Sequence, residues 1–239
     1  MCSSDLAGAT GPDLWKNVQQ ATVGAQAGRW SVEAGLFLSP IGPESMAVRD
    51  SWNWSRSNLF FGLPFYHTGL RFTFRPAAPH ALTFGVFNGW NSVVDNNVAK
   101  SVLLQYTYDP SADLTLNALY FGGIERDRAD PAGVAWRSLF DVYLRARVAR
   151  RVTLMAHLDV GFEPNARGIN RWAAAAGYAR FQLTDALRLA LRADFFFDGA
   201  PPAGQRIFWA ADWMTSQTVR SEEHTSELQS PCNLVCRLL

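Results

Sequence analysis

The sequence predicts an all-β protein, a transmembrane antiparallel up-and-down β-barrel, and three observations indicate this class. Apolar residues recur with a period of two along most of the chain. The alternating segments are about ten residues long, and short turns and longer loops connect them in turn, as in outer-membrane barrels. Finally, no stretch approaches the ~18 consecutive apolar residues of a transmembrane helix.

The alternation is clearest between residues 187 and 197, where leucine, alanine and phenylalanine alternate with Arg188, Arg192 and Asp194. Successive side chains of a strand point to opposite faces, so this segment has one apolar and one largely polar face. The same pattern predicts eleven strands, near residues 17–25, 30–38, 66–75, 81–91, 99–108, 113–123, 136–149, 151–162, 171–183, 186–198 and 206–218.

The predicted connections differ in length on the two sides of the sheet. Short turns are expected near residues 25–29, 75–80, 108–113, 150–151 and 184–185. Longer loops are expected near residues 39–66, 92–98, 124–135, 163–170 and 198–205. A soluble sandwich does not require this asymmetry, although its core could also hold the many aromatic rings.

Composition excludes two other classes. The 239 residues are 48% hydrophobic, 13% aromatic and 18% charged, with a net charge of +1. The hydrophobic content excludes a disordered polyelectrolyte. The near-neutral charge gives no basic surface for nucleic acid, so no nucleic-acid partner is expected.

Both ends of the chain look foreign to the fold. Residues 220–239, RSEEHTSELQSPCNLVCRLL, resemble the in-frame translation of a short-read sequencing adapter, and residues 1–6, MCSSDL, resemble its reverse complement. We therefore expect a barrel fragment at residues 7–219 between two non-native segments. All three cysteines lie in the end segments, so no disulfide or zinc site is expected from them. No signal peptide is visible at the start.

Most of residues 7–219 resemble a known family. The run GPESMAVRDSWNWSRSNLFFGLPFYHTGLRFTF, residues 42–74, and the later Asn-Gly-Trp-Asn at residues 88–91 are similar to the "putative beta-barrel porin-2" family. The matching positions are Gly42, Glu44, Asn53, Ser55, Arg56, Ser57, Phe60, Pro64, His67, Gly69, Asn97, Lys100, Ser101 and Asp141. The resemblance implies an outer-membrane, porin-like barrel with roughly 14–16 strands in the intact protein, so about 11 strands would be a truncated barrel.

The polar rows of the strands are predicted to face the interior of the barrel. They include Arg71, Arg75, Arg145, Arg147, Arg180, Arg188 and Arg192, with the acids Glu33, Asp141, Asp159 and Asp194. A charge facing lipid would cost ~2–4 kcal/mol at the bilayer midplane. Interspersed charges keep a lumen wet, and the excess of arginine favours anions mildly. An equally good interpretation is that these residues form ion pairs that brace the wall.

The segment at residues 39–66 is the longest predicted loop, and loops beyond ~12–15 residues are usually functional or disordered. It carries Glu44, Arg49, Asp50 and Arg56. We hypothesise that it enters the lumen as a constriction, with Glu44 and Arg56 paired or facing each other. The alternative is an extracellular cap with solvated charges.

No motif of an enzyme or of a cofactor site is present in the sequence. His67, His80 and His157 lie on separate predicted elements without ligand spacing, so no metal site is expected. His67 with Ser55 or Ser57 is the one pair that could suggest a hydrolase, and such pairs are usually plain loop residues.

The sequence therefore predicts a porin-like channel of the bacterial outer membrane for passive diffusion of small hydrophilic solutes. Its expected partners are outer-membrane lipid and small solutes or ions, and no cofactor is expected. The alternatives are a non-conducting barrel with a structural or surface role, and a soluble all-β binding module.

Overall fold

The computed structural model describes residues 18–94, 98–127, 129–208, 213–223 and 233–236. These residues form one twelve-stranded sheet in sequential order, with each strand antiparallel to its neighbours. The predicted all-β, antiparallel, up-and-down architecture is confirmed. None of the described helices has the length and apolar character needed to cross a membrane.

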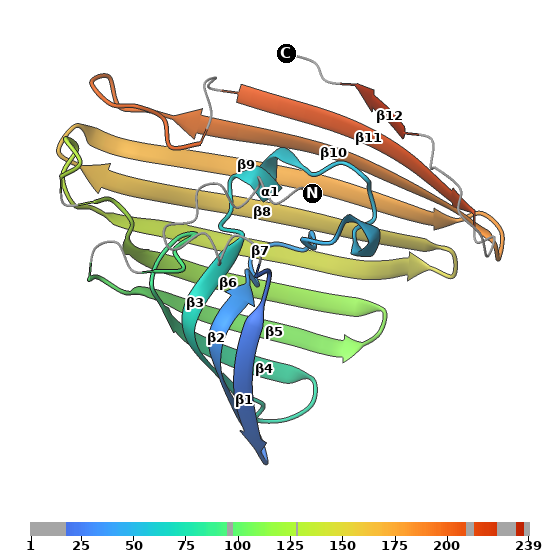
Figure 1. Ribbon diagram of the computed structural model, residues 1–239. Coiled ribbons are helices and arrows are strands. Elements are labelled where there is room, and N and C mark those ends of the chain that lie inside the picture. Colours follow the sequence, from blue (N-terminus) through green and yellow to red (C-terminus); the bar gives the residue numbers. More distant parts are fainter. Residues whose placement is uncertain (1–17, 95–97, 128, 209–212, 224–232, 237–239) are drawn as a thin grey trace.

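Figure 1 shows the strands, whose bounds follow in chain order. They are β1 (Ala21–Ala27), β2 (Trp30–Leu38), β3 (Tyr66–Phe74), β4 (His80–Phe87), β5 (Ser101–Ser111), β6 (Leu114–Ile124), β7 (Trp136–Ala149), β8 (Val152–Asn165), β9 (Gly168–Gln182), β10 (Leu187–Gly199), β11 (Trp213–Glu223) and β12 (Asn233–Cys236).

The sheet curves around a long internal loop (Figure 1). This loop, residues 39–65, joins β2 to β3 and contains the 3₁₀ turn η3 (Val48–Asp50) and the short helix α1 (Asn58–Phe61). Strands β1 and β12 end the sheet, and no pairing joins them among the described residues. The sheet is therefore strongly curved but not closed.

One predicted long loop is wrong. The segment 163–170 was expected to be a loop, but β8 continues to Asn165 and β9 begins at Gly168, so a two-residue turn joins them. The Asn165 Oδ1 atom accepts a hydrogen bond from the backbone N–H of Arg167 at 2.9 Å, and Gly168 has a φ of +124°. An asparagine and a glycine are what such a tight turn requires.

The last predicted strand is also displaced, because it was expected at residues 206–218 and β11 is Trp213–Glu223. The Asp198 carboxylate accepts the backbone N–H of Phe208 at 2.7 Å and holds this segment at the interior. The Phe208 ring then contacts Trp172 at a centroid distance of 5.1 Å. The β10–β11 pairing continues four residues beyond Val219, where the barrel fragment was expected to end.

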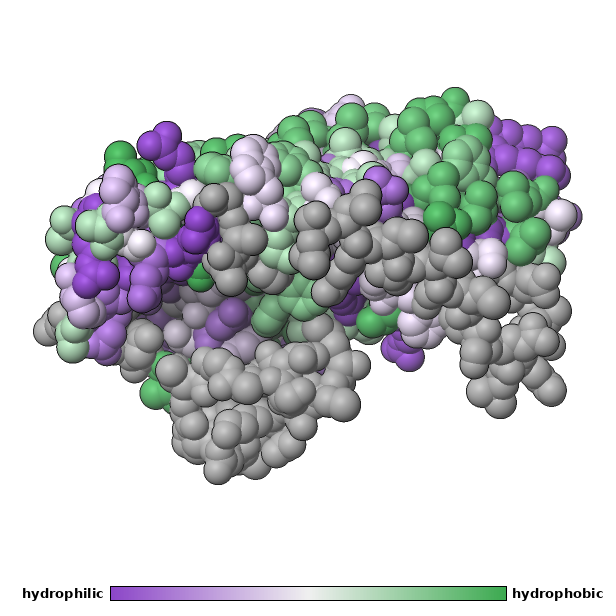
Figure 2. Space-filling view, turned by 90° about the horizontal axis from the view of Figure 1, so that it is seen from above, coloured by the Kyte–Doolittle hydropathy of each residue, from purple (hydrophilic) through white to green (hydrophobic). Residues whose placement is uncertain are grey.

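The outer face of the sheet is apolar. Figure 2 shows hydrophobic residues along one long side of the molecule and hydrophilic residues towards its ends. Many large apolar side chains are exposed on the strands, among them Phe72, Phe84, Leu104, Phe140, Leu144, Leu158, Val160 and Phe162. In water such a continuous patch is unusual for a monomer, whereas a barrel wall in lipid requires it.

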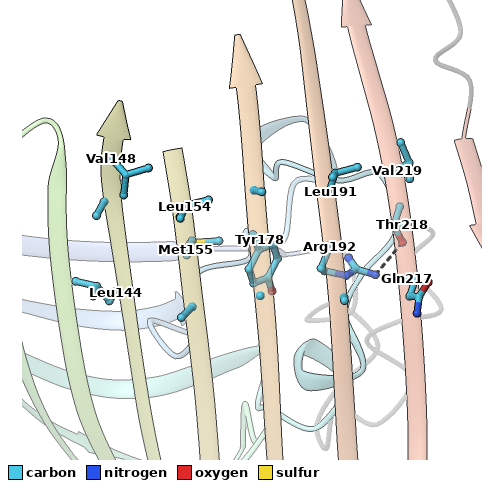
Figure 3. A pocket seen from close by; sticks show the side chains of 15 residues that line it. Leu144, Val148, Leu154, Met155, Tyr178, Leu191, Arg192, Gln217, Thr218 and Val219 are labelled. Atoms are coloured by element: carbon cyan, nitrogen blue, oxygen red, sulfur yellow. Dashed lines mark hydrogen bonds between the residues drawn. The ribbon is translucent and has the colours of Figure 1, made fainter. Parts of the chain in front are cut away.

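Between β7 and β11 the outer face contains a shallow groove of about 710 Å³ (Figure 3). Leu144, Val148, Leu154, Leu191 and Val219 form its apolar rim. A Cβ atom at Gly177 would meet no other atom within 4 Å, so the glycine leaves open space in the groove.

The inner face carries both an apolar core and most of the buried polar groups. The core contains Phe37, Leu59, Phe87, Phe121, Leu139, Trp172 and Phe196. The side chains of the internal loop thus pack against the wall and fill part of the interior.

Candidate functional site

The internal loop is bound to the wall by Arg192, which lies on β10 and is 3% exposed. Its Nε atom donates to Asp194 Oδ2 at 3.1 Å, and its Nη1 atom donates to Glu44 Oε1 at 3.1 Å. Its Nη2 atom donates to the Arg56 carbonyl oxygen at 2.7 Å. Figure 3 shows the same guanidinium reaching Thr218 on β11. One side chain therefore joins two parts of the loop to two strands.

Asp194 and Ser57 complete this attachment. The Asp194 Oδ1 atom accepts hydrogen bonds from the backbone and side-chain N–H groups of Asn58, at 3.1 and 2.8 Å. Ser57 caps α1 by accepting the backbone N–H of Phe60 at 3.2 Å, while its hydroxyl donates to Glu44 Oε2 at 2.8 Å. The short helix thus begins where the sequence supplies a serine cap.

Two tryptophans of the loop lie against arginines of the wall. The Arg180 guanidinium lies 4.5 Å from the ring centroid of Trp52, and that of Arg220 lies 4.9 Å from Trp54. The Arg220 Nη1 atom also donates to the Ser51 carbonyl oxygen at 3.0 Å. These contacts place the loop on the inner side of the sheet, as the constriction hypothesis requires, and not outside it.

Glu44 and Arg56 were expected to pair or to face each other, and the structure gives each of them other contacts. Glu44 pairs with Arg192, whereas the Arg56 guanidinium donates to the Met46 carbonyl oxygen at 2.5 Å and lies over the Phe60 ring at 4.4 Å. The wall arginine competes for Glu44 because it is buried and needs an anionic partner.

Between the loop and the wall lies a polar cavity of about 290 Å³. Glu44 and Asp50 line it from the loop, Asp109 lines it from β5, and Arg145 lines it from β7. Asp50 also forms an exposed ion pair with Arg49 at 3.7 Å. Acidic groups of the loop therefore share this cavity with a basic group of the wall.

Arg145 belongs to a basic group on the inner wall, which we define as Arg145, Arg147, Arg180 and Arg188. Its members lie on β7, β9 and β10, towards the short turns, and the positive charges of the other three act on Arg180. Arg147 pairs with Asp113 at 2.8 Å. Among the described residues, the other three form no ion pair with a carboxylate.

The remaining predicted pore residues divide into two groups. Arg71 and Glu33 form an ion pair of 2.6 Å across β2 and β3, while Arg75 lies just beyond β3 and is exposed. Four residues face inward but are buried by the loop and the core, so they are not exposed to a lumen as the pore-lining prediction requires. They are Asp141, Asp159, Arg192 and Asp194, and none is more than 6% exposed.

Sequence reasoning missed a second buried ion cluster, at the opposite end of the wall. The Glu163 carboxylate is fully buried and binds Arg126 and, at 2.8 Å, Arg137. Arg126 in turn binds Asp130 at 2.9 Å, which orders part of the connection between β6 and β7. Continuing the alternation of β8 one step past Gly161 would have assigned Glu163 to the inner face.

His67 and the loop serines have different hydrogen-bond partners. The His67 imidazole is fully buried, its Nε2 atom lies 3.2 Å from Ser39 Oγ, and its Nδ1 atom lies 3.3 Å from the Gly89 carbonyl oxygen. Ser55 and Ser57 instead bond to Thr218 and Glu44.

We expect the Asp130 carboxyl to titrate at an unusually low pH. The hydrogen bond from the Ala132 backbone N–H and the pairing with Arg126 lower the pKa of Asp130 below 3.8. A group whose pKa is lowered by folding contributes stability above its unfolded value and loses it as pH falls through its folded value. The ordered connection should therefore persist at about pH 5 and loosen only under stronger acid. An NMR titration of the Asp130 carboxyl carbon in micelles measures this midpoint.

The Arg126→Gln variant provides the control for this titration, because it removes one cause and keeps the Ala132 hydrogen bond. Its midpoint should lie above that of the unmodified protein. A midpoint that does not move, or one at 3.8 or higher in the unmodified protein, would contradict the assignment.

Comparison with known proteins supports the architecture. A family model described as "Putative beta-barrel porin-2, OmpL-like" matches residues 2–225. The chain belongs to this family. Comparison with curated proteins gives no match.

Two solved structures share the fold of this porin-2 chain. One is the outer-membrane expressed OmpT of Vibrio cholerae, with a TM-score of 0.58 and 11% identity over 87% of this chain. The other is the outer membrane channel DcaP of Acinetobacter baumannii, with a TM-score of 0.58 and 11% identity over 82% of this chain. The alignments cover 66% and 62% of those two structures, so the chain spans less than two thirds of their length.

Proposed function

We propose that the protein to which this chain belongs is an outer-membrane channel for passive diffusion of small hydrophilic solutes, with a mild preference for anions. The observation that carries the channel function is the polar cavity between the internal loop and the wall, with Glu44 and Asp50 on the loop and Arg145 on the wall. A loop bound inside a curved sheet narrows the lumen and sets charges of opposite sign at the narrow point. Membership of a porin-like family supports the outer-membrane location.

The anion preference rests on charges of the basic group that no carboxylate neutralises. Arg145, Arg180 and Arg188 lie on the inner wall without an ion pair among the described residues. A part of the wall with an excess of one sign of charge raises the local concentration of ions of the opposite sign. The other interpretation, that wall charges brace the barrel, applies to Glu33 with Arg71 and to Asp194 with Arg192.

One observation favours a second function, that of a non-conducting barrel with a structural role. The apolar core and the buried network around Arg192 fill part of the interior. No such observation supports the soluble binding module. Phe84, Leu104 and Phe140 lie exposed on the outer face, where a soluble protein would have polar side chains. We propose no enzymatic activity for either barrel.

Measurement of ion conductance separates the two barrel functions. We expect the full-length protein to produce discrete conductance steps in a planar bilayer. With a KCl gradient, the reversal potential should have the sign of a chloride-preferring channel. Reconstituted, correctly folded protein that neither conducts nor allows liposome swelling with small sugars would favour the filled barrel instead.

A further inference from the structure

Two neighbouring strands bring three ionisable side chains together on the inner face. Asp141 lies on β7, and His157 and Asp159 lie on β8. The His157 Nε2 atom is 2.6 Å from Asp141 Oδ2 and 3.2 Å from Asp159 Oδ1. We define these residues as the Asp-His-Asp cluster. Its donor atoms all lie within 4.8 Å of one another.

The cluster is enclosed by apolar groups. Its three side chains are at most 2% exposed. The residues paired with them on the adjoining strands carry no charge, and they are Leu119 on β6 and Ala174 and Ala176 on β9. From the internal loop, Gly42 lies so close that a Cβ atom there would be 3.1 Å from His157 Cε1. Among the described residues, no arginine or lysine forms an ion pair with either carboxylate.

With both carboxylates ionised, the charges of the cluster are not balanced by its own members. Asp141 and Asp159 are directly paired across the ladder, and like charges in that position repel. Within the described part of the chain, three of their four carboxylate oxygens, together with His157 Nδ1, have no hydrogen-bond partner. In that state a protonated imidazole cancels one of the two negative charges, and a bound cation would balance the other. Buried charges of this kind are normally paired or coordinate a metal.

We propose that the Asp-His-Asp cluster binds one divalent cation of the first transition row. His157 Nε2 and one oxygen each of Asp141 and Asp159 would be its protein ligands. Imidazole nitrogen and carboxylate oxygen are ligands for such ions, with Zn–N and Zn–O distances of about 2.0–2.2 Å. Because the donor atoms lie within 4.8 Å of one another, only small side-chain movements would bring them to these distances from one ion. The bound ion would join β7 to β8 beneath the internal loop, whether or not the barrel conducts.

Zinc binding to the purified, detergent-solubilised protein tests this site. After treatment with EDTA and dialysis against Zn²⁺, we expect one zinc ion per chain by elemental analysis. The Asp159→Asn and His157→Gln variants should each lose at least about 100-fold in zinc affinity, because even the loss of a group that only hydrogen-bonds to a metal ligand costs about 10- to 100-fold. Circular dichroism confirms that each variant is folded.

Two matched variants exclude non-specific binding. Asp113→Asn makes the same substitution in a half-exposed carboxylate that pairs with Arg147. His80→Gln removes a histidine whose Nδ1 atom lies 2.7 Å from the Tyr106 hydroxyl oxygen. Both should retain the zinc affinity of the unmodified protein.

Cobalt provides a readout that does not depend on the variants. Co²⁺ bound at the cluster should give visible d–d absorption that Zn²⁺ displaces with one-to-one stoichiometry. Absence of stoichiometric zinc and of this absorption in the unmodified protein would overturn the proposal. Zinc affinity unchanged in both cluster variants would overturn it as well, and the cluster would then be a proton-sharing group.

Discussion

Replacement of Arg192 by methionine is expected to lower the free energy of unfolding by about 3–5 kcal/mol, the usual cost of breaking a buried ion pair from one side. Methionine fills a similar volume but leaves Asp194 and Glu44 without the cation that both now contact. The loop also loses the hydrogen bond to the Arg56 carbonyl oxygen. Urea titration followed by tryptophan fluorescence measures the change, since the chain has nine tryptophans.

The matched control for this variant is Arg147→Met. Arg147 and Asp113 form an ion pair of 2.8 Å, but both side chains are about half exposed, at 49% and 51%. Exposed pairs contribute about 0–1 kcal/mol, so this variant should unfold at nearly the same urea concentration as the unmodified protein. Equal effects of the two substitutions would show that Arg192 is not the attachment point of the loop.

Neutralisation of the basic group should weaken the anion preference that belongs to the proposed function. The double variant Arg145→Gln, Arg180→Gln removes two charges from the wall that have no carboxylate partner in the part of the chain that the structure describes. A unit charge about 4 Å away contributes about 1 kcal/mol in water, which corresponds to roughly a five-fold change in local ion concentration. The chloride-to-potassium permeability ratio should therefore fall several-fold, as measured by reversal potentials in planar bilayers.

Arg151→Gln is the control for this double variant. Arg151 lies in the turn between β7 and β8, and its Nη1 atom donates to the Leu183 carbonyl oxygen at 3.3 Å. Since this side chain belongs neither to the cavity nor to the basic group, its loss should leave the permeability ratio unchanged. The location of the selectivity site is wrong if Arg151→Gln lowers the ratio as much as the double variant does.

The facing of the strands could be predicted because it depends on a purely local property. Leu158 and Val160 are exposed on the outer face while His157 and Asp159 are buried on the inner face, as the period of two requires. Loop lengths were predicted less well. Residues 163–170 were expected to form a long loop, but Asn165 and Gly168 form a tight turn there. These two turn residues determine the length of the connection, and the overall polarity of the segment does not.

By itself, the sequence determined the all-β class, the antiparallel order, the apolar outer face and the presence of a long loop rich in charge. These follow from alternation and length, which each segment carries independently of the others. Only the tertiary structure decided which charges meet. Glu44 lies 148 positions from Arg192, and Asp141 lies 16 positions from His157, in both cases because strand register and loop placement set the contact. Register depends on pairing along the whole sheet, so chain spacing does not reveal the cavity or the Asp-His-Asp cluster.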